Sequence, residues 1–443
     1  MRNIFIIAIL LLSTVPAYAR ASLDKGAGNP EYTVRTLSAA SRASSLSLPA
    51  AKSTEINADT MAASHAADTI APAAVSAPAV TAESADTTGN GKQQKKRTSY
   101  WHRLFKGNED HTFDKKLDIS FVLSPSYTRE ASFGIGGLAS GLYRLDRTDS
   151  IMKPSDVTIM GNVSVSGLYV IAVGGNNYFK GNRSRLSYEV AFANQPLRFW
   201  GIDYASCAEN PPIDYTRRRV MVDIQYLYRI VDRLLLGVRS EISYVNIKKI
   251  DDPAYLQGQA MSYTFTGIGL SLQYDSRDFI PNPQKGIYAM AEVTAYPRFL
   301  GTYDKTRMRT TLIFDTYHRL WESGILATDI YGRFNGKNTP WILREQLGGS
   351  TRMRGYYAGR YIDNNILSCQ AELRQRIYKR IGCTVWGGCG TVFPSFGEFN
   401  WKNILPTYGV GLRWEFKHRV NIRIDYGFGK NSSGFIFNIN EAF

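Results

Sequence analysis

The sequence of 443 residues is poor in cysteine and histidine, two residues that often bind metals or carry out nucleophilic chemistry. Its four cysteines are too few for a disulfide framework, and the absence of a C-x-x-C pair argues against a zinc or redox site. None of the five histidines stands in a Ser/His or Asp/His motif, and the chain has no phosphate-binding loop or cluster of metal ligands. We therefore expect no enzymatic activity, no cofactor and no metal site.

Long hydrophobic runs are also missing after residue 20. No stretch of about twenty apolar residues follows, so we expect no membrane-spanning helix. Residues 1–19 have the parts of a secretory signal peptide, namely a positive start at Arg2, an apolar run from Ile4 to Leu12 and an A-x-A cleavage site at residues 17–19. No cysteine follows the cleavage site, which argues against a lipoprotein. The sequence thus predicts an exported protein.

Two segments separate the signal peptide from the rest of the chain. Residues 20–98 are dominated by Ala, Ser and Thr without an apolar period, so they cannot bury enough surface to offset the entropy of ordering. We expect them to form a disordered periplasmic linker. Residues 99–115 combine basic residues with aromatic ones such as Trp101 and Phe105, as suits a juxtamembrane segment at the inner interface. A solvated end to the linker is the alternative.

The formal net charge of +15 limits the choice of partners. An exported chain without a nucleic-acid motif is not expected to bind nucleic acid. Attraction to outer-membrane lipid or lipopolysaccharide is one interpretation, and a merely basic lumen and surface is the other.

From residue 116 to residue 443 the sequence alternates with period two. Val420, Ile422 and Ile424, for example, alternate with Asn421 and Arg423. One face is apolar and aromatic, and the other carries charges of both signs. These segments are roughly nine to twelve residues long, whereas strands of soluble proteins have about five or six and membrane-spanning strands have about ten. The pattern predicts an all-β fold, a transmembrane antiparallel β-barrel, with aromatic girdles at its two interfaces.

Counting the alternating segments gives about sixteen strands. Short connections interleave with long ones, as in bacterial outer-membrane barrels, and an even count leaves both chain ends in the periplasm. The expected strands begin near residues 117, 132, 157, 168, 184, 218, 233, 263, 286, 306, 323, 365, 381, 407, 419 and 433.

A long Gly-rich loop, Gly348 to Asp363, separates two of these strands. Loops of this length are usually functional, and we expect this one to fold back into the lumen as a plug. On the strand after it, Cys369 and the later Cys389 face outward by parity. They either pair as a disulfide or stand as two small lipid-facing residues.

The chain stops on an aromatic residue, Phe443, with Phe437 and Ile439 on the same face. This pattern resembles the C-terminal signal by which outer-membrane barrels are recognised for assembly, although Glu441 on that face departs from it. An ordinary edge strand is the alternative interpretation.

Three stretches together resemble the barrel of the BamA/TamA outer-membrane assembly family, the bacterial surface antigen barrels. The resemblance covers residues 116–443. It is carried by a strand-turn motif with Asp275, Arg277, Asp278 and Gly286, by the plug-loop motif Arg354-Gly355-Tyr356, and by the following E-x-R, Glu372 to Arg374. The family has its R-G-F/Y loop between strands eleven and twelve, where this chain has it. Family members usually carry periplasmic modules, and the Ala/Ser-rich segment cannot be one, so we expect a short member without them.

The resemblance gives these residues expected roles in the lumen. An arginine that leaves bulk water needs an anionic partner, and by parity Glu372 can supply it. Gly355 gives the loop tip its tight turn, and Tyr356 packs against the wall. The family's next strand carries an aromatic-x-Asp-x-Gly, which here begins at Trp386. Gly388 stands in the place of the aspartate, so Glu372 is expected to be the main anionic partner.

The family's mechanism implies a weak seam between the first and last strands. Pro125 lacks an amide donor in the first strand, and Gly434 adds flexibility to the last. We expect a protein of the Gram-negative outer membrane that assists insertion or translocation of client proteins through this seam, together with client or partner outer-membrane proteins. The alternatives are a solute or lipid transport pore and a non-catalytic scaffold subunit of an outer-membrane complex.

Overall fold

The computed structural model describes residues 116–443 except 129, 131, 150–151, 281 and 418. The expected signal peptide (1–19), linker (20–98) and juxtamembrane segment (99–115) lie outside these residues. None of the helices in the described part of the chain is long and apolar enough to cross a membrane.

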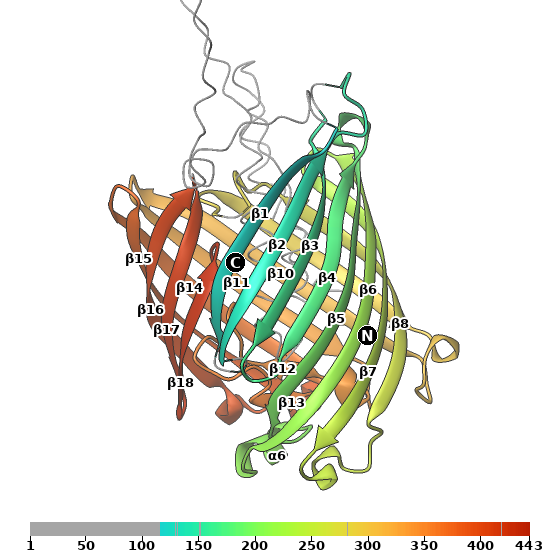
Figure 1. The fold of residues 1–443 in the computed structure, drawn as a ribbon. Helices are drawn as coiled ribbons and strands as arrows, with labels where there is room; N and C mark the ends of the chain where they lie inside the picture. Colours follow the sequence, from blue (N-terminus) through green and yellow to red (C-terminus); the bar gives the residue numbers. More distant parts are fainter. Residues whose placement is uncertain (1–115, 129, 131, 150–151, 281, 418) are drawn as a thin grey trace, which may run out of the picture. The chain divides into compact units, whose positions relative to one another are not determined.

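Sixteen antiparallel strands form one continuous sheet that curves into a β-barrel (Figure 1). Each strand pairs with its neighbours in the sequence, except that β11 pairs with β14 across an inserted two-stranded sheet of β12 and β13. The strands are β1 (Asp118–Thr128), β2 (Ser132–Tyr143), β3 (Ser155–Ser164), β4 (Tyr169–Tyr178), β5 (Ser184–Phe199), β6 (Ile213–Val231), β7 (Leu234–Ile250), β8 (Ser262–Asp275), β9 (Gly286–Tyr296), β10 (Arg307–Trp321), β11 (Gly324–Asn335), β12 (Glu345–Leu347), β13 (Tyr361–Asp363), β14 (Asn365–Tyr378), β15 (Ile381–Phe393), β16 (Leu405–Lys417), β17 (Val420–Gly429) and β18 (Ser432–Ile439).

The predicted fold class and strand count are confirmed. Fifteen of the sixteen barrel strands begin within two residues of the predicted position. The exception is β6, which begins at Ile213 rather than near residue 218, because its first residues are mostly polar and hide the alternation. Their pairing with the end of β5 extends the ladder as far as Phe199 opposite Ile213. The small β12–β13 sheet was not predicted.

The two faces of the sheet have the polarity of a membrane barrel. On β16, Val410 and Leu412 are 55% and 57% exposed, whereas Arg413 is only 5% exposed. The outward face is therefore apolar and the inward face is charged, the reverse of a soluble core. Buried charges consequently line the lumen, where they must find partners in other strands or in the plug.

The connections differ at the two ends of the barrel. One end, here called the turn end, has tight turns such as residues 232–233, 322–323 and 379–380, and the other, the loop end, carries the long loops. The helices are α6 (Tyr204–Glu209) and the 3-10 turns η1 (Lys180–Asn182), η2 (Pro253–Leu256), η3 (Arg298–Leu300), η4 (Trp341–Leu343), η5 (Phe396–Glu398) and η6 (Trp401–Asn403).

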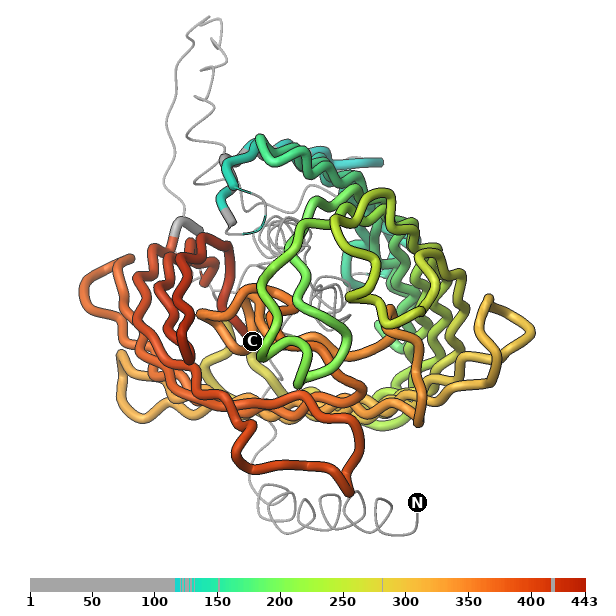
Figure 2. The backbone as a smooth tube through the Cα atoms, turned by 90° about the horizontal axis from the view of Figure 1, so that it is seen from below, coloured from blue at the N-terminus to red at the C-terminus, as the bar shows by residue number. Residues whose placement is uncertain are grey.

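The segment 336–364 enters the barrel from the loop end, and Figure 2 shows it inside the ring of strands. It contains η4, β12 and β13, and its side chains Trp341, Leu347 and Tyr361 belong to a buried cluster with wall residues such as Phe199 and Tyr215. β12 and β13 pair from Glu345–Asp363 to Leu347–Tyr361, so this small hairpin holds the base of the loop together. The segment is a plug, as the sequence predicted.

The end of the chain departs from the prediction that Phe443 shares an outward face with Phe437 and Ile439. β18 ends at Ile439, and Asn440 has a φ of 66°, which breaks the alternation. Glu441 then lies buried among lumen arginines rather than on the apolar face. The carbonyl oxygen of Phe443 accepts a hydrogen bond of 3.0 Å from Arg374. A single left-handed residue thus turns the last residues inward, toward buried charges.

Candidate functional site

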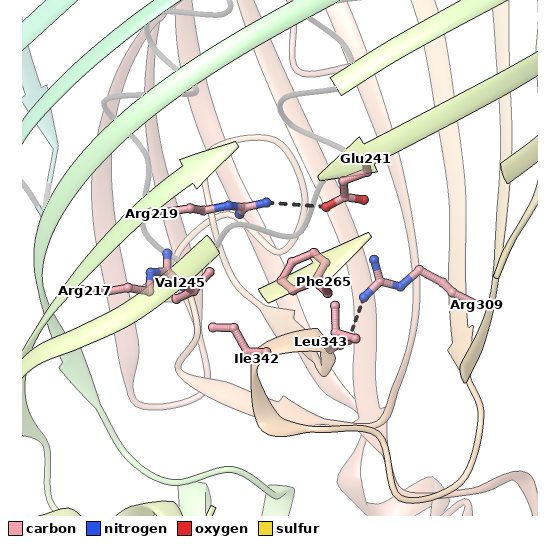
Figure 3. Close-up of a pocket in the computed structure, with 8 residues that line it drawn as sticks. All are labelled: Arg217, Arg219, Glu241, Val245, Phe265, Arg309, Ile342 and Leu343. Atoms are coloured by element: carbon pink, nitrogen blue, oxygen red, sulfur yellow. Dashed lines mark hydrogen bonds and ion pairs between the residues drawn. The ribbon is translucent and has the colours of Figure 1, made fainter. Parts of the chain in front are cut away.

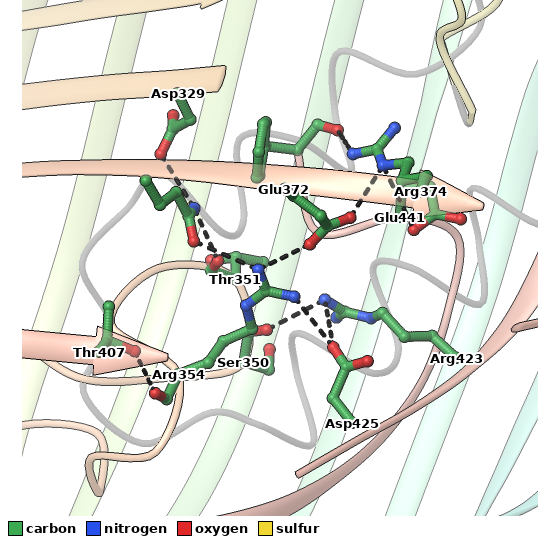
Figure 4. Close-up of polar contacts among 12 residues, drawn as sticks. Asp329, Ser350, Thr351, Arg354, Glu372, Arg374, Thr407, Arg423, Asp425 and Glu441 are labelled. Carbon is green, nitrogen blue, oxygen red and sulfur yellow. Dashed lines mark hydrogen bonds and ion pairs between the residues drawn. The ribbon is translucent and has the colours of Figure 1, made fainter. Parts of the chain in front are cut away.

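Arg354, at the tip of the plug, is fully buried and bound between two carboxylates (Figure 4). Its guanidinium lies 2.6 Å from Glu372 on β14 and 3.0 Å from Asp425 on β17. The guanidinium carbon also stacks 3.8 Å from the ring centre of Trp386 on β15. Charge-assisted pairs and a cation–π contact together compensate the loss of water around this arginine. The plug is therefore attached to three separate strands through one side chain.

The attachment belongs to a larger charge network, here called the latch network. It contains the arginines 354, 374, 413 and 423 and the acids 372, 425 and 441, all with side chains at most 5% exposed. Arg413 on β16 connects its parts, because it lies 2.6 Å from Asp425 and 2.7 Å from Glu441. Arg374 lies 2.8 Å from Glu372. The network thus joins the plug tip, three barrel strands and the end of the chain.

The backbone of the loop tip lies directly on β17. Gly355 has a φ of +105°, and a Cβ there would meet the carbonyl carbon of Phe428 at 2.7 Å. A Cβ on Gly427 would likewise come within 2.8 Å of the Arg354 backbone, and one on Gly429 within 2.4 Å of the Tyr356 ring. Such approaches are open only to glycine. Gly427 and Gly429 form the surface on which the loop tip rests.

The hydroxyl group of Tyr356 acts both as a hydrogen-bond donor and as an acceptor, and both bonds hold the side chain in place. The hydroxyl donates a hydrogen bond of 2.7 Å to the carbonyl of Pro406 and accepts one of 2.6 Å from the amide of Lys430. The side chain is 1% exposed, so the phenol is both buried and satisfied. The Gly355 carbonyl in turn accepts a hydrogen bond from Ser432 on β18. The R-G-Y tip therefore contacts β16, β17 and β18 at once.

Gly388, where the related family has an aspartate, lies opposite Gln370 in the β14–β15 ladder. A Cβ at this position would meet the Cys369 carbonyl oxygen at 2.3 Å, so the backbone leaves no room for a side chain. The expectation that Glu372 acts as the main anionic partner was incomplete, because Asp425 supplies a second carboxylate from β17. The structure places the missing negative charge two strands further along the barrel.

A second arginine of the plug, Arg352, makes a separate attachment. Its guanidinium contacts both carboxylate oxygens of Asp329 on β11, at distances from 2.6 to 3.0 Å. It also lies 4.2 Å from the ring centre of Tyr331. Arg352 and Arg354 thus fix the loop tip to one continuous stretch of the wall, from β11 through its neighbour β14 to β17.

The strand-turn motif lies at the turn end, between β8 and β9, and does not meet the latch network. Arg277 pairs with Asp275 at 3.2 Å and stacks 4.3 Å from the Tyr288 ring centre. Asp278 accepts hydrogen bonds from the amides of the turn and lies 2.8 Å from Arg419, next to the β16–β17 turn. Gly286 begins β9 with a φ of +113°. This motif shapes the turn and braces it against a neighbouring one.

Comparison with known proteins places the chain in a family. A model of the Omp85 superfamily domain matches residues 175–443, which is more than half of the chain. This protein belongs to the Omp85 superfamily. It is therefore a β-barrel of the Gram-negative outer membrane, and the predicted resemblance is confirmed at the level of the superfamily.

Solved structures agree on the fold of this Omp85 barrel. It is similar to BamA from Haemophilus ducreyi lacking POTRA domains 1–3, with 10% identity and a TM-score of 0.51, over 73% of this chain and 70% of that one. It is also similar to CdiB from Escherichia coli, with 11% identity and a TM-score of 0.52, over 74% of this chain and 63% of that one. A search of curated proteins found no match. At this identity the likeness concerns the fold alone.

The ends of the Omp85 sheet meet at a narrow contact. β1 and β18 are the two end strands of the order found among the described residues. The ring of Tyr127 on β1 lies 6.0 Å from that of Phe435 on β18. Pro125 occupies β1 opposite Ile135 of β2, and Gly434 occupies β18 opposite Gly427 of β17. Both predicted seam residues thus lie in the end strands.

Sequence reasoning missed three members of the plug attachments, namely Asp425, Arg352 and Asp329. Asp425 lies two residues after Arg423 and so shares the charged face of its strand, which was the available signal. Parity cannot predict that Glu372 and Asp425 bind the same arginine across the lumen, because β14 and β17 are not neighbours. For Arg352, its position two residues before Arg354 in an inserted loop was the corresponding hint.

Proposed function

We propose that this Omp85 protein inserts or translocates other proteins at the outer membrane through a lateral seam between β1 and β18. The observation that carries the proposal is the strand order, in which these two strands are the ends of an otherwise continuous sheet. Unpaired backbone groups are costly in lipid, so an edge that separates is a template for a strand of a client protein. Client outer-membrane proteins are the partners this geometry suits.

The properties of β18 support an opening at this place. It has eight residues, whereas its partner β17 has ten and β1 has eleven. The chain leaves the strand direction at Asn440, so the edge is shortened at its turn end. Pro125 removes one amide donor from β1. Each feature lowers the number of hydrogen bonds available to close the seam.

The plug argues against an open pore for solutes. Its side chains Met353, Arg354 and Tyr356 are at most 2% exposed, and its arginines bind carboxylates on β11, β14 and β17. Passage through the lumen would require breaking several buried ion pairs. A lateral route leaves the plug in place.

The outward face supports an interaction with outer-membrane lipid or lipopolysaccharide. Apolar side chains such as Leu123 and Leu270 are more than 60% exposed along the strands, and the chain carries a net charge of +15. Apolar contacts with acyl chains and attraction to anionic headgroups are the interactions this surface offers.

A disulfide across the seam tests the lateral route. In a chain with Cys369, Cys383 and Cys389 replaced by serine, Tyr127→Cys and Phe435→Cys are introduced and cross-linked. Cys207 can remain, because burial raises the pKa of its thiol to about 12 and keeps it unreactive. The readout is insertion of a purified outer-membrane client into liposomes that contain the protein.

The matched control joins the same β18 residue to its permanent neighbour, using Tyr426→Cys with Phe435→Cys, because these residues are paired in the β17–β18 ladder. We expect the seam cross-link to abolish insertion reversibly, with recovery after reduction, and the control cross-link to leave it unchanged. Full activity with the seam locked would exclude lateral opening. A conductance that survives both cross-links, without insertion, would favour a transport pore.

A further inference from the structure

A small cavity in the lumen, apart from the latch network, is lined by three arginines and one acid. Arg217 and Arg219 of β6, Glu241 of β7 and Arg309 of β10 line it, and Figure 3 shows the three guanidinium groups arranged around it. Apolar side chains complete the walls, namely Val245, Phe265, Ile342 and Leu343. Its volume of about 20 Å³ is enough for a small guest.

The charges around this cavity do not balance. Arg219 lies 3.5 Å from Glu241, which is the one acid among the residues that line the cavity. Arg309 lies 3.6 Å from Glu345, but that acid is shared with Arg333 at the same distance. Among the residues that line the cavity, one acid thus faces three arginines.

Arg217 has the least compensation. It is 1% exposed, and its guanidinium donates two hydrogen bonds to the amide oxygen of Gln195, at 3.2 and 2.8 Å. Among the residues that the structure describes, no carboxylate lies within ion-pair distance of it. A neutral amide satisfies two donors but does not neutralise the charge, and a buried charge without a counter-charge is strongly unfavourable.

We propose that this cavity binds one small anion, of which chloride is the natural candidate. The anion supplies a counter-charge to Arg217 and shares it with Arg219 and Arg309. Water fits the same volume but brings no charge.

The site has a structural consequence for the plug. Ile342 and Leu343 of η4 close one side of the cavity, and Arg309 donates a hydrogen bond of 2.8 Å to the Leu343 carbonyl. A bound anion orders the guanidinium of Arg309 while that group holds the plug. Occupancy of the site therefore stabilises the base of the plug against β6, β7 and β10.

Thermal unfolding of the purified full chain in detergent tests the proposal. The protein is compared in chloride, bromide and gluconate salts at equal ionic strength, since gluconate is a much bulkier anion than a halide. We expect chloride and bromide to raise the Tm above that in gluconate. For the same rise in Tm, Arg217→Gln should need a halide concentration about ten times higher.

The matched control is Arg218→Gln, which makes the same charge change on the outward face of the same strand. It should retain the halide response of the unmodified chain, and the comparison cancels general salt effects. An equal halide response in Arg217→Gln, or none in the unmodified chain, would overturn the proposal.

A second measurement does not depend on the variant folding. Crystals of the unmodified protein grown with bromide are examined for anomalous scattering. We expect a bromide peak between the guanidinium groups of Arg217 and Arg309. Ordered density without an anomalous signal would show that water alone fills the cavity, and the proposal would then be wrong.

Discussion

The guanidinium of Arg354 lies 3.0 Å from the carboxylate of Asp425, which is 71 residues further along the chain. Asp425 and Glu372 thus place two acids around one fully buried arginine. The same two acids also contact Arg413, so the plug tip is not an isolated ion pair. Removing any one member leaves a buried charge without its partner, and that cost exceeds the net value of the pair.

Arg354→Ala is expected to destabilise the barrel rather than to abolish a chemical step. It leaves Glu372 and Asp425 in the lumen without their shared cation, at a cost of about 3–5 kcal/mol. The measurement is the temperature at which the folded barrel loses its faster migration in gel electrophoresis, together with the yield of folded protein in membranes. Arg376→Ala, at an exposed position of β14, is the control and should behave like the unmodified chain. Unchanged stability of Arg354→Ala would show that the latch network does not stabilise the barrel.

Asp425→Asn tests whether the second carboxylate is part of the same unit. We expect it to destabilise the barrel, since Arg354, Arg413 and Arg423 all lie within 3.5 Å of this side chain. Combined with Arg354→Ala, the two changes should cost clearly less than the sum of the single changes, by about 1–3 kcal/mol. Denaturant unfolding of the four proteins gives the coupling directly. Strict additivity would mean that the two residues act independently.

Gly427→Ala probes the contact between the loop tip and β17. The added methyl group would meet the Arg354 backbone at 2.8 Å, so the tip must move away from the strand and stretch its ion pairs. We expect a loss of stability of about 1–3 kcal/mol and faster proteolysis within residues 348–360. Gly387→Ala is the matched control, because a Cβ there meets nothing within 4 Å. Equal behaviour of the two variants would show that the close approach carries no energy.

Much of this architecture was predictable because a barrel strand is a local, two-residue pattern. Alternation gave the strands and their faces, and parity placed Glu372 and Arg374 on the lumen side. Two features could not be predicted from the sequence, for physical reasons. The pairing of Arg354 with Asp425 depends on the curvature that brings β14 and β17 to one point, and no neighbouring-strand pattern contains it. The inward turn of the chain end depends on one residue, Asn440, whose left-handed backbone leaves no trace in the periodicity.

The same parity argument placed Cys369 and Cys389 outward, and the ladder makes them direct partners between β14 and β15. Their sulfur atoms lie 3.6 Å apart. Opposed residues of an antiparallel pair have Cα atoms about 4.5–5.5 Å apart, which is within the range that a disulfide spans. Oxidation, which removes two electrons and two protons from the thiols, therefore needs little movement of the backbone.

We expect a mild oxidant to join Cys369 to Cys389 in the membrane-embedded protein. Labelling with a high-mass maleimide after unfolding should then show two fewer reactive thiols, with full recovery after reduction. Cys383 is the internal control, because its partners in the ladder are Gln375 and Leu412 and it has no thiol opposite it. Cys369→Ser should leave Cys389 reactive under the same oxidation. Because both side chains face away from the lumen, the disulfide should leave the Arg354 attachment and the unfolding temperature of the plug variants unchanged. Persistence of all four thiols after oxidation would show that the two strands hold the sulfur atoms apart.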